Sequence, residues 1–98
     1  MGTLSYGTGV EVEVDDRSLA HLDYVLRQAL GAAMTFQLHV HTEEAGRRKV
    51  LALTIGNGVP LALAWDDEHM RLDQGVINHS LAQLRSAMVL VVPFPDEG

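Results

Sequence analysis

Two histidines separated by one residue, His39 and His41, are the side chains in this sequence best suited to chemistry. Residues two apart on a strand point to the same face, so both imidazoles could reach one zinc ion. Zinc needs a third and usually a fourth ligand, and the candidates for that role have no diagnostic spacing: His21, Glu43, His69 and His79. Strand alternation by itself explains why both positions are polar. We therefore favour a histidine-lined sheet face over a metal site.

That strand face would also carry Gln37, and Trp65 ends a later strand. A sheet covered by helices on one face leaves its other face, or an edge strand, to a partner. We therefore expect a non-enzymatic protein-interaction module that binds a protein partner or forms a homodimer through Gln37, His39, His41 and Trp65. An apolar core edge is the competing interpretation of Trp65. Two alternatives stay open: a small metal- or ligand-binding protein using His39 and His41, and a nucleic-acid-associated protein.

The nucleic-acid alternative depends on one basic run, Arg47-Arg48-Lys49, which lies beside Glu43 and Glu44. Phosphate binding is dominated by clustered lysine and arginine. This chain has 7 basic against 13 acidic side chains and a net charge of −6. The run is therefore more typical of a solvated hairpin tip than of a phosphate clamp, and nucleic acid is not the expected partner.

The residue types and motifs give little support to catalysis or to cofactor binding. The chain has no cysteine, which excludes disulfides, thiolate metal sites and a cysteine nucleophile. It also lacks the nucleophile-elbow, Walker and dinucleotide-binding glycine motifs. Acidic clusters at residues 15–16 and 66–68 are typical of a helix cap and a solvated loop. The sequence predicts no catalytic residue and no cofactor.

The chain of 98 residues is long enough for one small domain with a real core. We expect a single domain over residues 1–98, in which residues 93–98 form a loose tail. No apolar run approaches the roughly 18 residues of a membrane span, and the first residues do not resemble a secretory signal. We therefore expect a cytoplasmic protein without membrane contact.

Hydrophobic periodicity predicts the order of the elements. Period-two alternation indicates strands at 10–14 and 34–42, and the turn residues Gly7-Thr8-Gly9 make the first of these part of a hairpin over residues 3–14. Strands at 49–55, 61–65 and 88–92 are indicated by apolar runs next to turn residues. Spacings of three and four predict a helix that opens at residues 15–18, with His21 outside its apolar stripe, and a second helix over 73–87. Short connections favour an antiparallel meander for the three central strands. The predicted fold is α+β, in the order ββαβββαβ, with a mostly antiparallel sheet and two helices packed on one face.

The sequence also resembles a family of short actinobacterial proteins with a domain of unknown function. The most specific part of the match is Asp15-Asp16-Arg17-Ser18-Leu19-Ala20-His21-Leu22, and weaker matches are Met1 to Gly7, Gly46-Arg47, Val59-Pro60-Leu61, Ile77-Asn78 and Val91-Val92-Pro93. The resemblance implies a cytoplasmic bacterial protein with no established activity. Members are often labelled ATP-dependent DNA ligases, but Lys49 is followed by Val50-Leu51-Ala52 rather than by a ligase motif. This chain also has His79-Ser80 where the family pattern has an aromatic residue.

Overall fold

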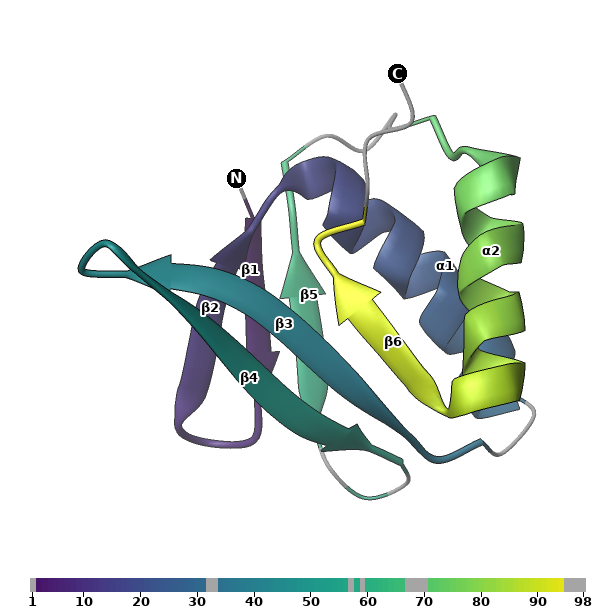
Figure 1. Ribbon diagram of the computed structural model, residues 1–98, viewed down its shortest axis with the longest axis horizontal. Coiled ribbons are helices and arrows are strands. Elements are labelled where there is room, and N and C mark those ends of the chain that lie inside the picture. Colours follow the sequence, from purple (N-terminus) through teal and green to yellow (C-terminus); the bar gives the residue numbers. More distant parts are fainter. Residues whose placement is uncertain (1, 32–33, 57, 59, 67–70, 95–98) are drawn as a thin grey trace.

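The computed structural model describes residues 2–31, 34–56, 58, 60–66 and 71–94, and arranges their strands in two three-stranded sheets (Figure 1). The elements in chain order are β1 (Gly2–Tyr6), β2 (Val10–Val14), α1 (Asp16–Gly31), β3 (Phe36–Glu44), β4 (Arg47–Ile55), β5 (Leu61–Ala64), α2 (Gln74–Ala87) and β6 (Val89–Val92). This order and the α+β class confirm the fold predicted from the sequence.

The first sheet has the strand order β2-β1-β5, and both of its pairings are antiparallel. β1 and β2 form the predicted hairpin, whose turn contains Gly7 at a φ of +63°, a conformation that glycine adopts without steric cost. In the part of the chain that the structure describes, β2 pairs only with β1. Its other edge therefore lies at the boundary of the sheet.

The second sheet has the order β4-β3-β6. β3 is antiparallel to β4 over its whole length and parallel to β6 over residues 37–40. Ala45 and Gly46 connect β3 to β4 with φ values of +53° and +77°. Two successive positive φ values define the type I′ turn, whose twist matches that of the flanking strands.

The position of β5 corrects the predicted meander. β5 pairs with β1 of the first sheet rather than with β4, and the N–H of Gly7 donates to the carbonyl of Pro60 at 2.9 Å. A short connection fixes the direction of the next strand only if the chain returns to the same sheet. Here the chain crosses from one sheet to the other, and Leu61 and Leu63 still pack against the core.

The core lies between the two sheets and the helices. In Figure 1, β3, β4 and β6 lie in front of β1, β2 and β5, and α2 stands beside β6. Both sheets and both helices contribute fully buried side chains: Leu4, Leu19, Leu22, Leu38, Ile77, Leu84 and Leu90. Within the described residues, no element covers the opposite face of the second sheet, and Val50 on it is 51% exposed.

His21 corrects the prediction that it lies outside the apolar stripe of α1, because its side chain is 0% exposed. Its Nδ1 lies 2.7 Å from the carbonyl oxygen of Arg17, and its Nε2 accepts the backbone N–H of Asp73 at 2.7 Å. A carbonyl only accepts, so the ring proton is on Nδ1. Phe94 packs edge-on against the ring. The imidazole therefore occupies a position in the core with both of its nitrogens hydrogen-bonded.

Phe94 also corrects the predicted start of the loose tail. Its side chain is 7% exposed, and its N–H donates to the buried hydroxyl of Ser18 at 3.0 Å. The chain is therefore held against α1 as far as Phe94, because the aromatic ring has apolar surface to bury. Residues 95–98 of the predicted tail lie outside the described residues. In the described part of the chain, no helix is long and apolar enough to cross a membrane.

Candidate functional site

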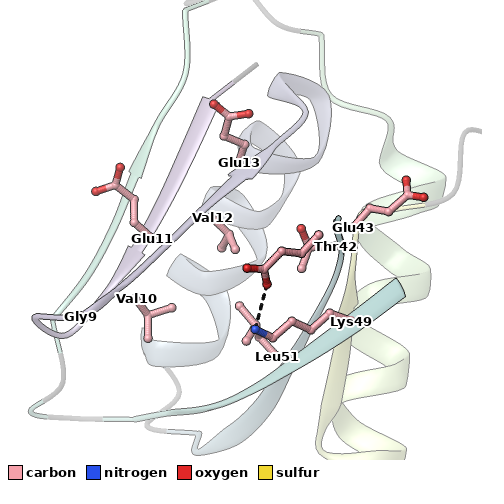
Figure 2. A pocket seen from close by; sticks show the side chains of 10 residues that line it. Gly9, Val10, Glu11, Val12, Glu13, Thr42, Glu43, Lys49 and Leu51 are labelled. Atoms are coloured by element: carbon pink, nitrogen blue, oxygen red, sulfur yellow. Dashed lines mark hydrogen bonds and ion pairs between the residues drawn. The ribbon is translucent and has the colours of Figure 1, made fainter. Parts of the chain in front are cut away.

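A cleft of about 580 Å³ opens between β2 of the first sheet and the β3–β4 hairpin of the second (Figure 2). Residues from both sheets line it: Gly9, Val10, Glu11, Val12, Glu13, Thr42, Glu43, Glu44, Lys49 and Leu51. The volume is within the range of about 300–1,000 Å³ that is usual for ligand pockets. The cleft is thus large enough to hold several side chains of a partner.

Unpaired strand edges border the cleft on both sides. β2 has no strand partner on this side, and the pairing of β3 with β6 ends at Val40, so residues 41–44 of β3 extend beyond it. Among the described residues, no backbone hydrogen bond joins β2 to β3. An edge strand presents alternating unpaired N–H and C=O groups. The two sheets therefore leave backbone donors and acceptors at the cleft.

The two faces of β2 differ in polarity. Figure 2 shows Val10 and Val12 on the side of β2 that faces Leu51, whereas Glu11 and Glu13 point to the other side. The three apolar side chains are partly buried and pack against the core. Both glutamates are exposed. The cleft thus has an apolar floor and an acidic rim along β2.

One ion pair crosses the β3–β4 side of the cleft. Lys49 Nζ lies 3.1 Å from Glu44 Oε2, and the dashed line in Figure 2 marks this contact. The lysine side chain is 53% exposed and the glutamate side chain 71% exposed. A pair so open to water contributes little stability, so it does not hold the cleft in one shape.

The polar side chains that line the cleft are mostly carboxylates, together with Thr42 and Lys49. The four glutamates that line it, Glu11, Glu13, Glu43 and Glu44, are all exposed. Carboxylates used as general acids need a buried or closely paired environment to separate their protonation states. These residues are better suited to binding than to proton transfer.

The predicted partner-binding residues of β3 lie together on the uncovered face of the second sheet. Gln37, His39 and His41 alternate with the buried side chains Phe36, Leu38 and Val40. Gln37 Nε2 donates to the hydroxyl of Thr54 on β4 at 2.8 Å. His41 also lines a smaller hollow of about 200 Å³, which shares Glu13 and Thr42 with the cleft. His41 is therefore the residue of this group that reaches the cleft region.

Trp65 is not brought to that face. It follows β5 in the other sheet, where it packs partly buried against the core. It lies next to Gly2, where an added Cβ would approach both the side chain of Trp65 and the carbonyl of Ala64. This environment supports the interpretation of Trp65 as an edge of the core.

His39 and His41 have no third metal ligand in the part of the chain that the structure describes. Within those residues, no group of three histidine, aspartate or glutamate side chains could hold a metal ion. Of the four additional ligands considered, His21 is buried and hydrogen-bonded at both ring nitrogens, and His79 is on α2. Glu43 is on β3, opposite Arg48 of β4. His69 lies outside the described residues.

The basic run is arranged as part of the hairpin. Arg47 is opposite Glu44, Arg48 is opposite Glu43, and Lys49 forms the ion pair with Glu44. The run therefore alternates between the two faces of β4, with an acidic residue near each position. This arrangement does not form a surface of a single sign, which phosphate binding requires.

Sequence reasoning did not identify the cleft. The sequence feature that bears most on the cleft is the alternation Val-Glu-Val-Glu-Val in β2. This alternation was sufficient to predict a half-buried strand. The alternation does not reveal that β2 is at the edge of its sheet or that β3 faces it. That relationship comes from the separation of the strands into two sheets.

These features define a small α+β domain of two open sheets, with a cleft where their edges face each other. A family model described as a domain of unknown function (DUF7882) matches residues 1–93, and the chain belongs to this family. The match confirms the resemblance to a family of unknown function. Comparisons with curated proteins and with solved structures found no match.

Proposed function

We propose that this protein is a non-enzymatic interaction module that binds an extended segment of another protein in the cleft. The segment adds as a strand to the free edge of β2. The observation that carries this proposal is the pair of unpaired edges, at β2 and at residues 41–44 of β3, on either side of an open cleft of about 580 Å³. In strand addition, main-chain hydrogen bonds supply affinity and alternate side chains supply specificity.

The dimensions of the cleft favour a short segment. β2 has five residues, and a strand rises about 3.4 Å per residue, so its edge offers about 17 Å for pairing. A segment of five to seven residues matches this length. Its inward side chains would cover the exposed parts of Val10, Val12 and Leu51, which adds a hydrophobic contribution to the backbone hydrogen bonds.

Blocking the cleft tests this function directly. The chain has no cysteine, so Thr42→Cys would carry one bulky maleimide in the cleft at a unique position. The probes are three acetylated, amidated and fluorescently labelled peptides, KVKVKVK, SVSVSVS and EVEVEVE, followed by fluorescence anisotropy. We expect at least one peptide to bind the unmodified protein and to lose at least about tenfold in affinity after modification, since strand addition needs the whole edge.

The control is Ala82→Cys, modified in the same way at an exposed position of α2 that does not line the cleft. It should bind as tightly as the unmodified protein. If no peptide binds, or if blocking Thr42 leaves binding unchanged, the proposed function is wrong.

A second candidate function is self-association through the uncovered face of the second sheet. In an acidic protein, the described residues at the centre of this face include no carboxylate: they are Gln37, His39, Ala52, Thr54 and Val91. A second copy can approach such a face without repulsion between carboxylates. β3 and β4 have nine residues each and the sheet has three strands, so strand rise and spacing give a face of roughly 30 by 14 Å, or about 400 Å². This area is well below the about 800 Å² per partner of a standard interface.

Self-association by this face is therefore expected to be weak. Sedimentation velocity should show a dimer only at protein concentrations of about 100 µM or more, given the small contact area. Replacing His39→Glu together with His41→Glu should abolish it by adding like charges on both copies. A monomer at every concentration, or a dimer insensitive to both substitutions, would rule out this face.

A further inference from the structure

We infer that the segment bound in the cleft is basic, with lysine or arginine alternating with apolar residues, and that it pairs along β2. This inference rests on the proposed function and adds the chemistry of the partner. β2 presents Glu11 and Glu13 on one face and valines on the other. A strand added beside it places its own side chains on the same two faces, so the pattern of β2 determines the pattern that complements it.

The acidic positions of β2 have no cation on their paired side. Glu11 is opposite Ser5 and Glu13 is opposite Thr3 in the register with β1. Neither glutamate takes part in a salt bridge or side-chain hydrogen bond with any of the described residues. Opposite charges on directly facing strand positions stabilise the pairing. The vacant edge of β2 therefore favours cations next to both glutamates.

The other side of the cleft is mixed in charge. Glu43 and Glu44 line it, but Arg48 and Arg47 lie opposite them on β4, and Lys49 forms an ion pair with Glu44. The attraction for a positively charged segment therefore comes from Glu11 and Glu13 on β2. At physiological salt this attraction extends about 8 Å, which covers a strand paired with β2.

The acidic pattern also argues against a second copy of this chain at the same edge. Pairing β2 with β2 of another copy would bring Glu11 and Glu13 close to the same residues of the partner strand. Like charges in cross-strand contact are destabilising, and charged side chains on edge strands prevent pairing between copies. The edge of β2 thus favours pairing with a basic strand and disfavours pairing with β2 of a second copy.

The inward positions of the bound segment must be apolar. They face Val10, Val12 and Leu51, whose partly buried side chains form the floor of the cleft. A polar side chain buried there without a hydrogen-bond partner would oppose binding. Alternation of basic and apolar residues is the pattern that satisfies both faces.

Calorimetric titration with the same three peptides tests the inference. The lysine–valine peptide should bind at least about fivefold more tightly than the serine–valine peptide, because two cross-strand charge pairs form. The glutamate–valine peptide should bind most weakly. In the variant Glu11→Lys with Glu13→Lys the order should reverse. Both glutamates are exposed, so the fold should tolerate the change, and thermal unfolding checks this.

A matched pair of variants separates local pairing from overall charge. Glu11→Gln with Glu13→Gln raises the net charge by two units and should lower the affinity for the lysine–valine peptide about fivefold. Gln28→Lys with Ala82→Lys makes the same change at exposed sites outside the cleft and should have a much smaller effect. Equal affinity for all three peptides would overturn the inference but leave the proposed function standing. Absence of binding by every peptide would instead overturn the proposed function.

Discussion

The imidazole of His21 in α1 accepts the backbone N–H of Asp73 at 2.7 Å, although 52 residues separate them in sequence. Asp73 is the N-cap of α2, and its carboxylate accepts the N–H groups of Gly75 and Val76. One buried ring thus connects the first turns of both helices. Because Nδ1 is hydrogen-bonded to the carbonyl oxygen of Arg17, both ring nitrogens have hydrogen-bond partners.

We predict that His21→Ala lowers the free energy of unfolding by about 3 kcal/mol, since it removes the acceptor of the Asp73 N–H and opens a cavity in the core. Urea denaturation gives the value. His79→Ala is the matched control, because His79 is exposed on α2, and it should change stability by less than about 0.5 kcal/mol. Equal effects of the two substitutions would contradict this role of His21.

Ser18 connects the first turns of α1 to the segment after β6. Its buried hydroxyl accepts the N–H of Phe94 at 3.0 Å. Ser18→Ala should lower the free energy of unfolding by about 1–2 kcal/mol, because the N–H of Phe94 loses its acceptor. Hydrogen exchange should also be faster at the Phe94 amide. Ser86→Ala, at an exposed position of α2, should leave both quantities nearly unchanged, and an unaltered Phe94 amide in Ser18→Ala would refute the link.

Ala45 adopts a φ of +53° in the turn between β3 and β4. A left-handed conformation is costly for alanine, whereas asparagine is favoured at the first position of an Asn-Gly type I′ turn. Ala45→Asn should therefore raise the free energy of unfolding by about 0.5–1 kcal/mol. Chemical denaturation measures the change. Ala82→Asn, in the middle of a helix, should instead be destabilising, and a loss of stability in both variants would contradict the assigned turn.

Tyr6, the last residue of β1, connects the two sheets. Its hydroxyl donates to the carbonyl of Thr54 in β4 at 2.6 Å. Tyr6→Phe removes only this hydrogen bond and should lower the free energy of unfolding by about 1 kcal/mol. Tyr24→Phe, on the exposed face of α1, provides the comparison and should be nearly neutral. If both substitutions have the same effect, the bond between the sheets does not contribute.

Local patterns predicted most of the elements. The alternation in β2 and β3 and the spacing of Leu19, Leu22 and Leu26 each depend on neighbours in sequence, and the structure has strands and a helix at these places. The division into two sheets was not predictable in this way. Leu61 and Leu63 would alternate in the same manner beside β4 or beside β1, so the sequence pattern of β5 is compatible with both partners.

The same limit applies to buried polar groups and to the cleft. His21 was predicted to lie outside the apolar stripe because the pattern of a helix records polarity, and the partner that satisfies this ring, Asp73, is remote in sequence. Gln37, His39 and His41 share a strand face as expected, since that follows from alternation alone. The acidic rim depends on the position of β2 at a sheet edge opposite β3, which alternation alone does not specify.

We propose that a bound segment adds as a strand to the free edge of β2, in the cleft between β2 and β3. The most direct test is a two-dimensional NMR titration of the isotope-labelled protein with the lysine–valine peptide. We predict that the largest amide shifts occur at residues 10–14 and 41–44, and that Glu11→Lys with Glu13→Lys abolishes them. Shifts concentrated elsewhere, such as the hollow lined by Leu26, Leu30 and Leu61, or no shifts at saturating peptide, would contradict the claim.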